Sequence, residues 1–187
     1  MSTATPISET DAAIAMLREL CRQFEGGAVL APMCVVVQPN EIPHPADALL
    51  VHHEHMTEVL RRHYGHPVEL HVLDEHREGD IYTRKVRLTP TGESERVVEW
   101  GIVRLHLHFM PDAVRDEILA KESPLGEILI RHQVLRRIKP RWFMRFPARE
   151  PVLTFFGERA DSPMYGRIGT IYCNEAPAIE LLEIVTS

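Results

Sequence analysis

The sequence lacks the signals of several protein classes. Its three cysteines, Cys21, Cys34 and Cys173, stand at spacings that match no zinc or redox motif, and they fit a reduced chain without disulfides. No stretch approaches the run of about 18 apolar residues that a membrane helix needs. The N-terminal segment carries acidic residues and no basic region before an apolar core, unlike a signal peptide. We therefore expect a cytoplasmic protein without a membrane segment.

A concentrated positive charge is also missing. Lysine and arginine are scattered along the chain, and the formal net charge is -6. Such a chain would repel a phosphate backbone, so a nucleic-acid partner is not expected. An anionic small molecule would have to be bound by a local arginine.

Metal-binding patterns are absent despite eleven histidines. His52, His53 and His55 cluster, and His106 and His108 share one face of an expected strand. The cluster of His52, His53 and His55 does not have the histidine and glutamate spacing of the familiar metalloprotease helix. For His106 and His108, the sequence identifies no carboxylate that would complete a metal site. We expect neither a metal nor another cofactor.

What the sequence does contain is typical of one globular domain. The chain has 187 residues, of which 44% are hydrophobic and 26% are charged. A chain of this length can bury a sizeable core without disulfides or structural metal ions. We expect a single domain over residues 1–187, with a helix and a connector in residues 1–43, and the oligomeric state is left open.

Hydrophobic periodicity predicts more strands than helices. The expected fold is α+β, with a single antiparallel sheet of about six strands and helices packed on one side, because strands and helices do not alternate. Helices are predicted at residues 8–27, 52–65, 111–122 and 125–132. Strands are predicted at residues 68–76, 81–90, 96–109, 134–146, 151–160 or 165–173, and 177–187.

The helix predicted from residue 125 has an unusual start. Ser123 is a candidate N-cap, Pro124 suits a first helical position, and Gly126 leaves the backbone accessible. Free amides at a helix start can hold an anion or a polar oxygen. Many helices begin in this way, so the start by itself does not define a site.

Several short segments together resemble one family. "SPLGEIL" followed by "VLRRI" is similar to a segment with a Pro-Leu-Gly core in the chorismate lyase (chorismate pyruvate-lyase) family. "HMTEVLRRHYGHPVELHVL" resembles that family's Met-Thr helix and first strand, "YTRKVRL" its arginine-bearing second strand, and "PAIELLEIV" its closing strand. The matches occur in the family's order, from about residue 45 to the end of the chain.

The resemblance implies a set of site residues. Arg84 would bind a substrate carboxylate, Glu183 would be the catalytic carboxyl group, and Met56, Leu125 and Gly126 would line the site. A partly buried Glu183 would have a raised pKa and exchange a proton with the substrate. The neighbouring Glu180 is the alternative carboxylate, and alternation along the strand places the two glutamates on opposite faces.

The sequence departs from the family at one arginine. The family's better-known enzymes carry a further arginine in the third strand, and the comparable place here is near Gly101 and Ile102, with Arg104 a few residues later. This departure leaves the substrate open.

Two functions follow from the resemblance. The first is a cofactor-independent lyase that eliminates pyruvate from chorismate to give 4-hydroxybenzoate, in the manner of ubiquinone biosynthesis. The second is a non-catalytic protein of the same fold that binds aromatic acids. In both, the partner is a small anionic molecule.

Overall fold

The computed structural model describes residues 7–24, 27–156 and 162–186. They form one antiparallel sheet of seven strands in the order β1-β5-β6-β7-β4-β3-β2. The strands are β1 (Val35–Val37), β2 (Val68–Glu78), β3 (Ile81–Pro90), β4 (Glu99–His106), β5 (Arg136–Phe146), β6 (Met164–Cys173) and β7 (Ala176–Val185). The predicted α+β class with a single antiparallel sheet is confirmed.

Short helices surround this sheet. The α-helices are α1 (Glu9–Cys21), α2 (Leu30–Met33), α3 (Ala46–Leu50), α4 (Met56–Tyr64), α5 (Asp112–Ala120), α6 (Leu125–Arg131) and α7 (Val152–Phe155), and the 3-10 helices are η1 (Gly27–Val29), η2 (Pro39–Glu41) and η3 (Leu107–Phe109). In the described residues, no helix is long and apolar enough to cross a membrane.

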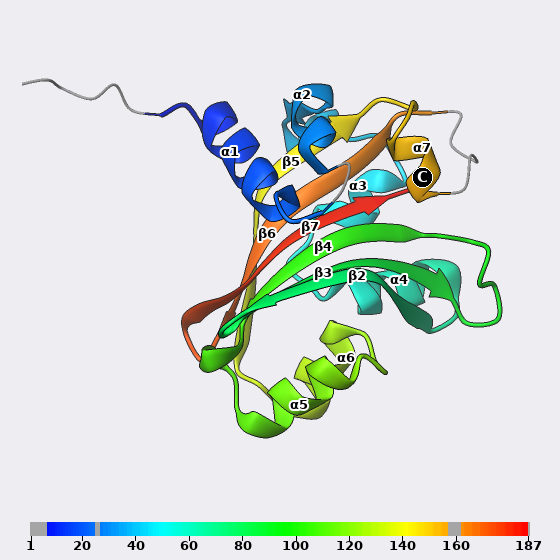
Figure 1. Ribbon diagram of the computed structural model, residues 1–187. Coiled ribbons are helices and arrows are strands. Elements are labelled where there is room, and N and C mark those ends of the chain that lie inside the picture. Colours follow the sequence, from blue (N-terminus) through cyan, green and yellow to red (C-terminus); the bar gives the residue numbers. More distant parts are fainter. Residues whose placement is uncertain (1–6, 25–26, 157–161, 187) are drawn as a thin grey trace, which may run out of the picture.

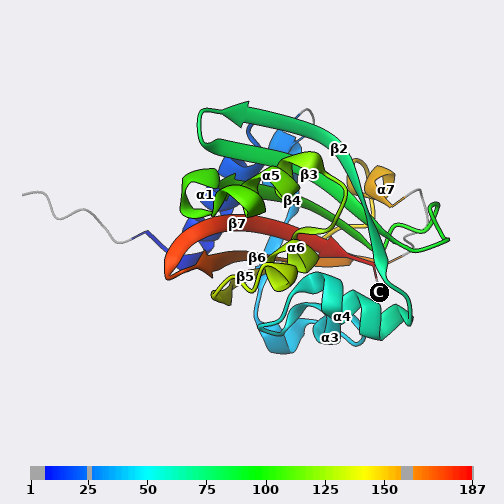
Figure 2. The same ribbon diagram turned by 90° about the horizontal axis from the view of Figure 1, so that it is seen from below.

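Alternation along the strands divides the core between the two faces of the sheet. On one face, α3 to α6 cover side chains such as Val103 and Leu181; Figure 2, which is seen from below, shows α5 and α6 in front of the sheet and α3 and α4 beside them. On the other face, α1, α2 and α7 cover side chains such as Trp100 and Leu182, and Figure 1 shows these three helices above the sheet. Helices α1, α2 and α7 thus add a second layer to the expected arrangement with helices on one side.

The chain order explains the topology. β2, β3 and β4 form a meander, and β5, β6 and β7 form a second one. The two meanders join where β4 pairs with β7, with Gly101 opposite Glu183. The terminal strand is therefore central in the sheet, and its side chains lie beside those of β4 and β6.

Several boundaries differ from the prediction. β1 and α3 were not predicted, because both are very short. The segment 96–109 ends as η3 rather than as a strand, and α7 occupies part of 151–160, so β6 corresponds to the alternative 165–173. Residues 157–160 of that segment lie outside the described residues.

Helix ends were predicted with mixed success. Ser8 caps α1, as expected, through a hydrogen bond from the backbone amide of Asp11. The helix ends at Cys21, earlier than the expected Gly26-Gly27, of which Gly26 lies outside the described residues. Gly65 ends α4 with φ 77°, a conformation that favours glycine. At α6 the prediction of a Ser123 cap was wrong: Pro124 is the N-cap residue, and no side chain caps that helix.

Candidate functional site

A small space, which we call the inner cavity, lies between the starts of α4 and α6 and the face of the sheet that α3 to α6 cover. Its volume is about 50 Å³, which accommodates only a few water molecules. It is lined by His55, Met56, Thr57, Leu70, Arg84, Val86, Leu88, Glu99, Val103, Pro124, Leu125, Gly126, Ile171, Leu181 and Glu183. All five residues that sequence analysis named for the site are among them.

The strand register explains why the charged side chains meet. Arg84 pairs with Val103, and Glu183 pairs with both Gly101 and Arg167. Paired residues project from the same face of a sheet, and alternation along β4 adds Glu99 to that face. Four strands therefore deliver two arginines and two glutamates to one side of the sheet.

The starts of α4 and α6, which we call the roof of the inner cavity, approach each other closely. A β-carbon on Gly126 would clash with Thr57 Oγ1 and would lie 3.0 Å from the His55 β-carbon. Only glycine therefore allows the start of α6 to pack this closely on the start of α4. Gly126 contributes by lacking a side chain.

Arg84 is a buried cation without an anionic partner. Its side chain is 1% exposed, its Nη1 donates a long hydrogen bond of 3.5 Å to the Ile118 carbonyl, and its other polar neighbour is the Tyr82 hydroxyl. Its Nε has no partner. The nearby Glu75 carboxylate is occupied, because it accepts hydrogen bonds from Tyr82 Oη at 2.5 Å and from Lys121 Nζ at 2.7 Å. Burial lowers the pKa of Arg84.

Glu183, by contrast, is already paired. Its Oε2 accepts a hydrogen bond from Arg167 Nε at 2.6 Å, and both side chains are buried. Arg167 Nη1 also donates to the carbonyl oxygens of Leu50 at 2.9 Å and His52 at 3.0 Å. The buried ion pair thereby ties the segment after α3 to the centre of the sheet.

A second carboxyl group lies beside this pair. Glu99 is 5% exposed, and its Oε2 has no hydrogen-bond partner among the described residues. Burial raises the pKa of Glu99 well above its usual range, and the neighbouring Glu183 raises it further, whereas Arg167 lowers it. The sequence prediction assigned a raised pKa to Glu183, and the structure adds Glu99 as a carboxyl group of this site whose pKa is raised.

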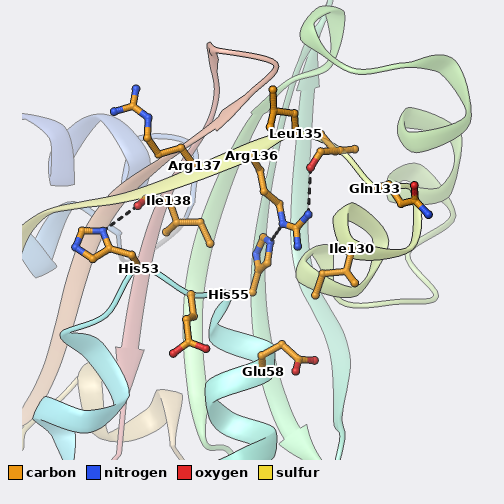
Figure 3. A pocket seen from close by; sticks show the side chains of 11 residues that line it. His53, His55, Glu58, Ile130, Gln133, Leu135, Arg136, Arg137 and Ile138 are labelled. Atoms are coloured by element: carbon orange, nitrogen blue, oxygen red, sulfur yellow. Dashed lines mark hydrogen bonds between the residues drawn. The ribbon is translucent and has the colours of Figure 1, made fainter.

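His55 separates the inner cavity from a larger space outside it. Its Nε2 accepts a hydrogen bond from Arg136 Nε at 2.5 Å, and burial, followed by the charge of Arg136, lowers the pKa of His55 to about 4. Figure 3 shows the His55 ring directed at the Arg136 guanidinium. His55 is therefore uncharged at neutral pH, as an acceptor of this hydrogen bond must be.

The outer groove has a volume of about 950 Å³ and is lined by residues of the segment before α4, of α6 and of β5. Figure 3 shows Arg136 and Arg137 on its β5 side and Glu58 on its α4 side. His55 lines both spaces. A ligand in the outer groove would therefore be separated from the inner cavity by the His55 side chain.

Comparison with known proteins shows the fold. No protein-family model and no curated protein matches the sequence. Among solved structures, PhnF from Mycobacterium smegmatis has a TM-score of 0.52 at 14% identity and covers 70% of this chain, which spans only 63% of PhnF. The effector domain of PhnF has a TM-score of 0.53 at 12% identity, covering 72% of this chain and 89% of the domain.

A third structure has a TM-score of 0.49 at 12% identity. It is the ligand-binding domain of a proposed GntR-family transcriptional regulator from Bordetella bronchiseptica, and the match covers 64% of this chain and 86% of that domain. The two matches to PhnF show that this chain has the fold of the PhnF effector domain, which is consistent with the chorismate lyase-like fold expected from the sequence.

The structure distinguishes the two glutamates, Glu183 and Glu180, that the sequence left as alternatives. Glu183 lines the inner cavity, whereas Glu180 lies on the opposite face and accepts a hydrogen bond from Arg104 Nε at 2.7 Å. Arg104 therefore does not replace the arginine that is missing near Gly101. The cation beside Glu183 comes instead from Arg167 on the neighbouring strand.

Sequence analysis missed three residues of the site. Glu99 and Arg167 each interrupt a run of apolar or small residues in a strand, and a lone charge in such a run is a signal for a buried polar group that needs a partner. Thr57 follows Met56 at the start of α4, and its Oγ1 has no partner in the described structure. Thr57 is the threonine of the Met-Thr segment that resembles the family, but it was not named as a site residue.

Proposed function

We propose that the chain binds a small carboxylic acid in the inner cavity, with the carboxylate on Arg84. The observation that carries this proposal is the burial of an arginine without a carboxylate partner. An unpaired buried charge is strongly unfavourable, and a bidentate carboxylate would compensate for it. The effector-domain fold of PhnF supports a binding role without defining a ligand.

The lining of the inner cavity favours an acid with an apolar body and a polar far end. Val86 and Val103 lie between Arg84 and the cluster of Glu99, Glu183 and Arg167. Glu99 lies four residues along β4 from Val103, which pairs with Arg84. Four residues of a strand span about 13 Å. An aromatic acid with a hydroxyl group opposite its carboxylate has matching ends.

Binding of such an acid requires the roof to move. A space that accommodates a few water molecules is too small for an aromatic ring, so the starts of α4 and α6 must separate. Both starts belong to short helices, and they contact each other at Gly126. Ligand entry should therefore proceed by displacement of these two helices from the sheet.

A second candidate is the elimination of pyruvate from chorismate to give 4-hydroxybenzoate. It is favoured by the convergence of Arg84, Glu183, Met56, Leu125 and Gly126 on one cavity. The reaction makes an aromatic ring, so its driving force lies in the substrate and it requires positioning and proton transfer rather than a cofactor. The Glu183 carboxylate is engaged in the ion pair with Arg167, whereas burial raises the pKa of Glu99, so Glu99 is the carboxyl group better suited to carry the proton.

One experiment separates the two candidates. Purified protein is mixed with chorismate without added metal, pyruvate is followed by a coupled assay, and the aromatic product is followed by chromatography. Pyruvate and 4-hydroxybenzoate in equal amounts would establish the lyase. An absence of turnover, together with thermal stabilisation by 4-hydroxybenzoate, is the result expected of a binding protein. Neither turnover nor stabilisation by any of a panel of small acids would overturn both.

A further inference from the structure

Glu99 is positioned to contact a ligand in the inner cavity. It lies at the start of β4 and lines the inner cavity, and its Oε2 is buried without a partner. Gly101, two residues along the same face, leaves room beside it, since a β-carbon there would lie 3.4 Å from Glu99 Oε1 and would clash with the Leu182 carbonyl. A buried carboxyl oxygen without a hydrogen bond is costly unless a ligand supplies one.

The charges around Glu99 determine its protonation. Glu183 from β7 and Arg167 from β6 form a 2.6 Å ion pair, and the remaining bonds of Arg167 go to backbone carbonyls and to the His52 ring. His52 and His55 both have lowered pKa values, chiefly through burial. Arg84 is more distant, because it pairs with Val103, which lies four residues from Glu99 along β4. Two carboxyl groups thus share one nearby guanidinium, and local neutrality requires one proton.

We propose that Glu99 holds this proton and donates it in a hydrogen bond to an oxygen of the ligand, at the end of the inner cavity opposite Arg84. This inference rests on the proposed binding function and adds a specificity determinant to it. The site would select acids that carry a hydroxyl or carbonyl oxygen at the far end. A hydroxyl group could also donate to the Glu183 carboxylate, so both glutamates would contact the same oxygen.

Two ligands test the inference in the unaltered protein. 4-Hydroxybenzoate and benzoate differ only in the far hydroxyl group, and isothermal titration calorimetry measures both. Benzoate should bind about tenfold or more weakly, because it leaves the buried carboxyl group unpaired. Equal affinities for the two acids would overturn the inference and leave the binding function intact. Failure of both acids and of the panel of small acids to bind would overturn the binding function itself.

Variants of Glu99 identify the donor. Glu99→Gln retains a donor and should keep the preference for 4-hydroxybenzoate, whereas Glu99→Leu removes the donor and should bind the two acids equally. Thermal unfolding without ligand shows whether each variant is folded. If Glu99→Leu kept the full preference while folded, another group would be the donor.

The protonation state is tested by repeating the titration of 4-hydroxybenzoate at neutral pH in two buffers with different heats of ionisation. If Glu99 is already protonated in the free protein, the observed heat is the same in both buffers. Uptake of about one proton per ligand bound would show that free Glu99 is ionised, which contradicts the inference.

Discussion

Replacement of Arg84 by methionine should stabilise the free protein while abolishing ligand binding. The reason is that Arg84 is 1% exposed, has no carboxylate within ion-pair distance in the described structure, and leaves its Nε unbonded. Methionine has a flexible, apolar side chain that can fill the same space. A side chain retained despite its cost to folding is typical of a functional site.

The expected gain can be bounded. Replacing buried ionic groups by apolar residues of similar volume is often stabilising by about 1 to 4 kcal/mol. The loss on the other side is small, because the hydrogen bond of Arg84 to the Ile118 carbonyl is 3.5 Å long and that carbonyl also accepts from the Lys121 amide at 3.3 Å, while the Tyr82 hydroxyl keeps its hydrogen bond to Glu75. For a chain of this length, each kcal/mol raises the midpoint of thermal unfolding by about 2 to 4 °C.

The assay is thermal and urea unfolding of the wild type and the variant, with and without 4-hydroxybenzoate. Arg104→Met is the matched control, since Arg104 also lies in a central strand but is paired with Glu180 and Glu19, and it should gain nothing. A loss of more than about 1 kcal/mol in Arg84→Met would refute the reasoning, because it would show that Arg84 stabilises the fold.

Three further predictions concern the roof and the ion pair. Gly126→Ala should lower the free energy of unfolding by about 1 to 3 kcal/mol through its clash with Thr57, and should weaken ligand binding in the same calorimetric assay. Acidification should destabilise the protein through His55, because its pKa in the folded protein, about 4, lies below the ordinary value of 6.5. The stability that neutral His55 contributes is complete above pH 6.5 and is lost as the pH falls to 4, by about 3 kcal/mol in all. Urea unfolding across this range should show the free energy of unfolding falling with pH in the wild type, and falling less in His55→Gln. Arg167→Met should cost about 3 to 5 kcal/mol because it leaves Glu183 buried and unpaired, and the addition of Glu183→Leu should restore part of that stability; an additive loss in the double variant would mean that the two side chains are not coupled.

The sequence predicted those parts of the fold that local patterns determine. Alternation identified β2 and β3, and the φ of 77° at Gly65 matches the expected end of α4. β1 has three residues and α3 has five, which is too short for either periodicity to be recognised. The segment 151–160 is apolar and aromatic like a strand, yet part of it packs as α7 on the face of the sheet that carries Trp100.

The site could be predicted only as far as resemblance reached. Arg84 and Glu183 were named because they stand in quoted segments, and strand pairing then brings Glu99 and Arg167 beside them. The pairing of β4 with β7 joins residues that are far apart in the sequence, so the approach of Glu99 to Glu183 could not be known in advance. Arg167 could have been suspected as a lone charge in an otherwise apolar strand, but its hydrogen bonds to the segment after α3 depend on the tertiary fold.

The most direct test of the central claim is calorimetric titration of the wild type and Arg84→Met with 4-hydroxybenzoate. The account predicts one binding site per chain in the wild type and none in the variant, with the variant folded and at least as stable in the absence of ligand. Binding of equal strength in both proteins would contradict the claim that Arg84 holds the carboxylate.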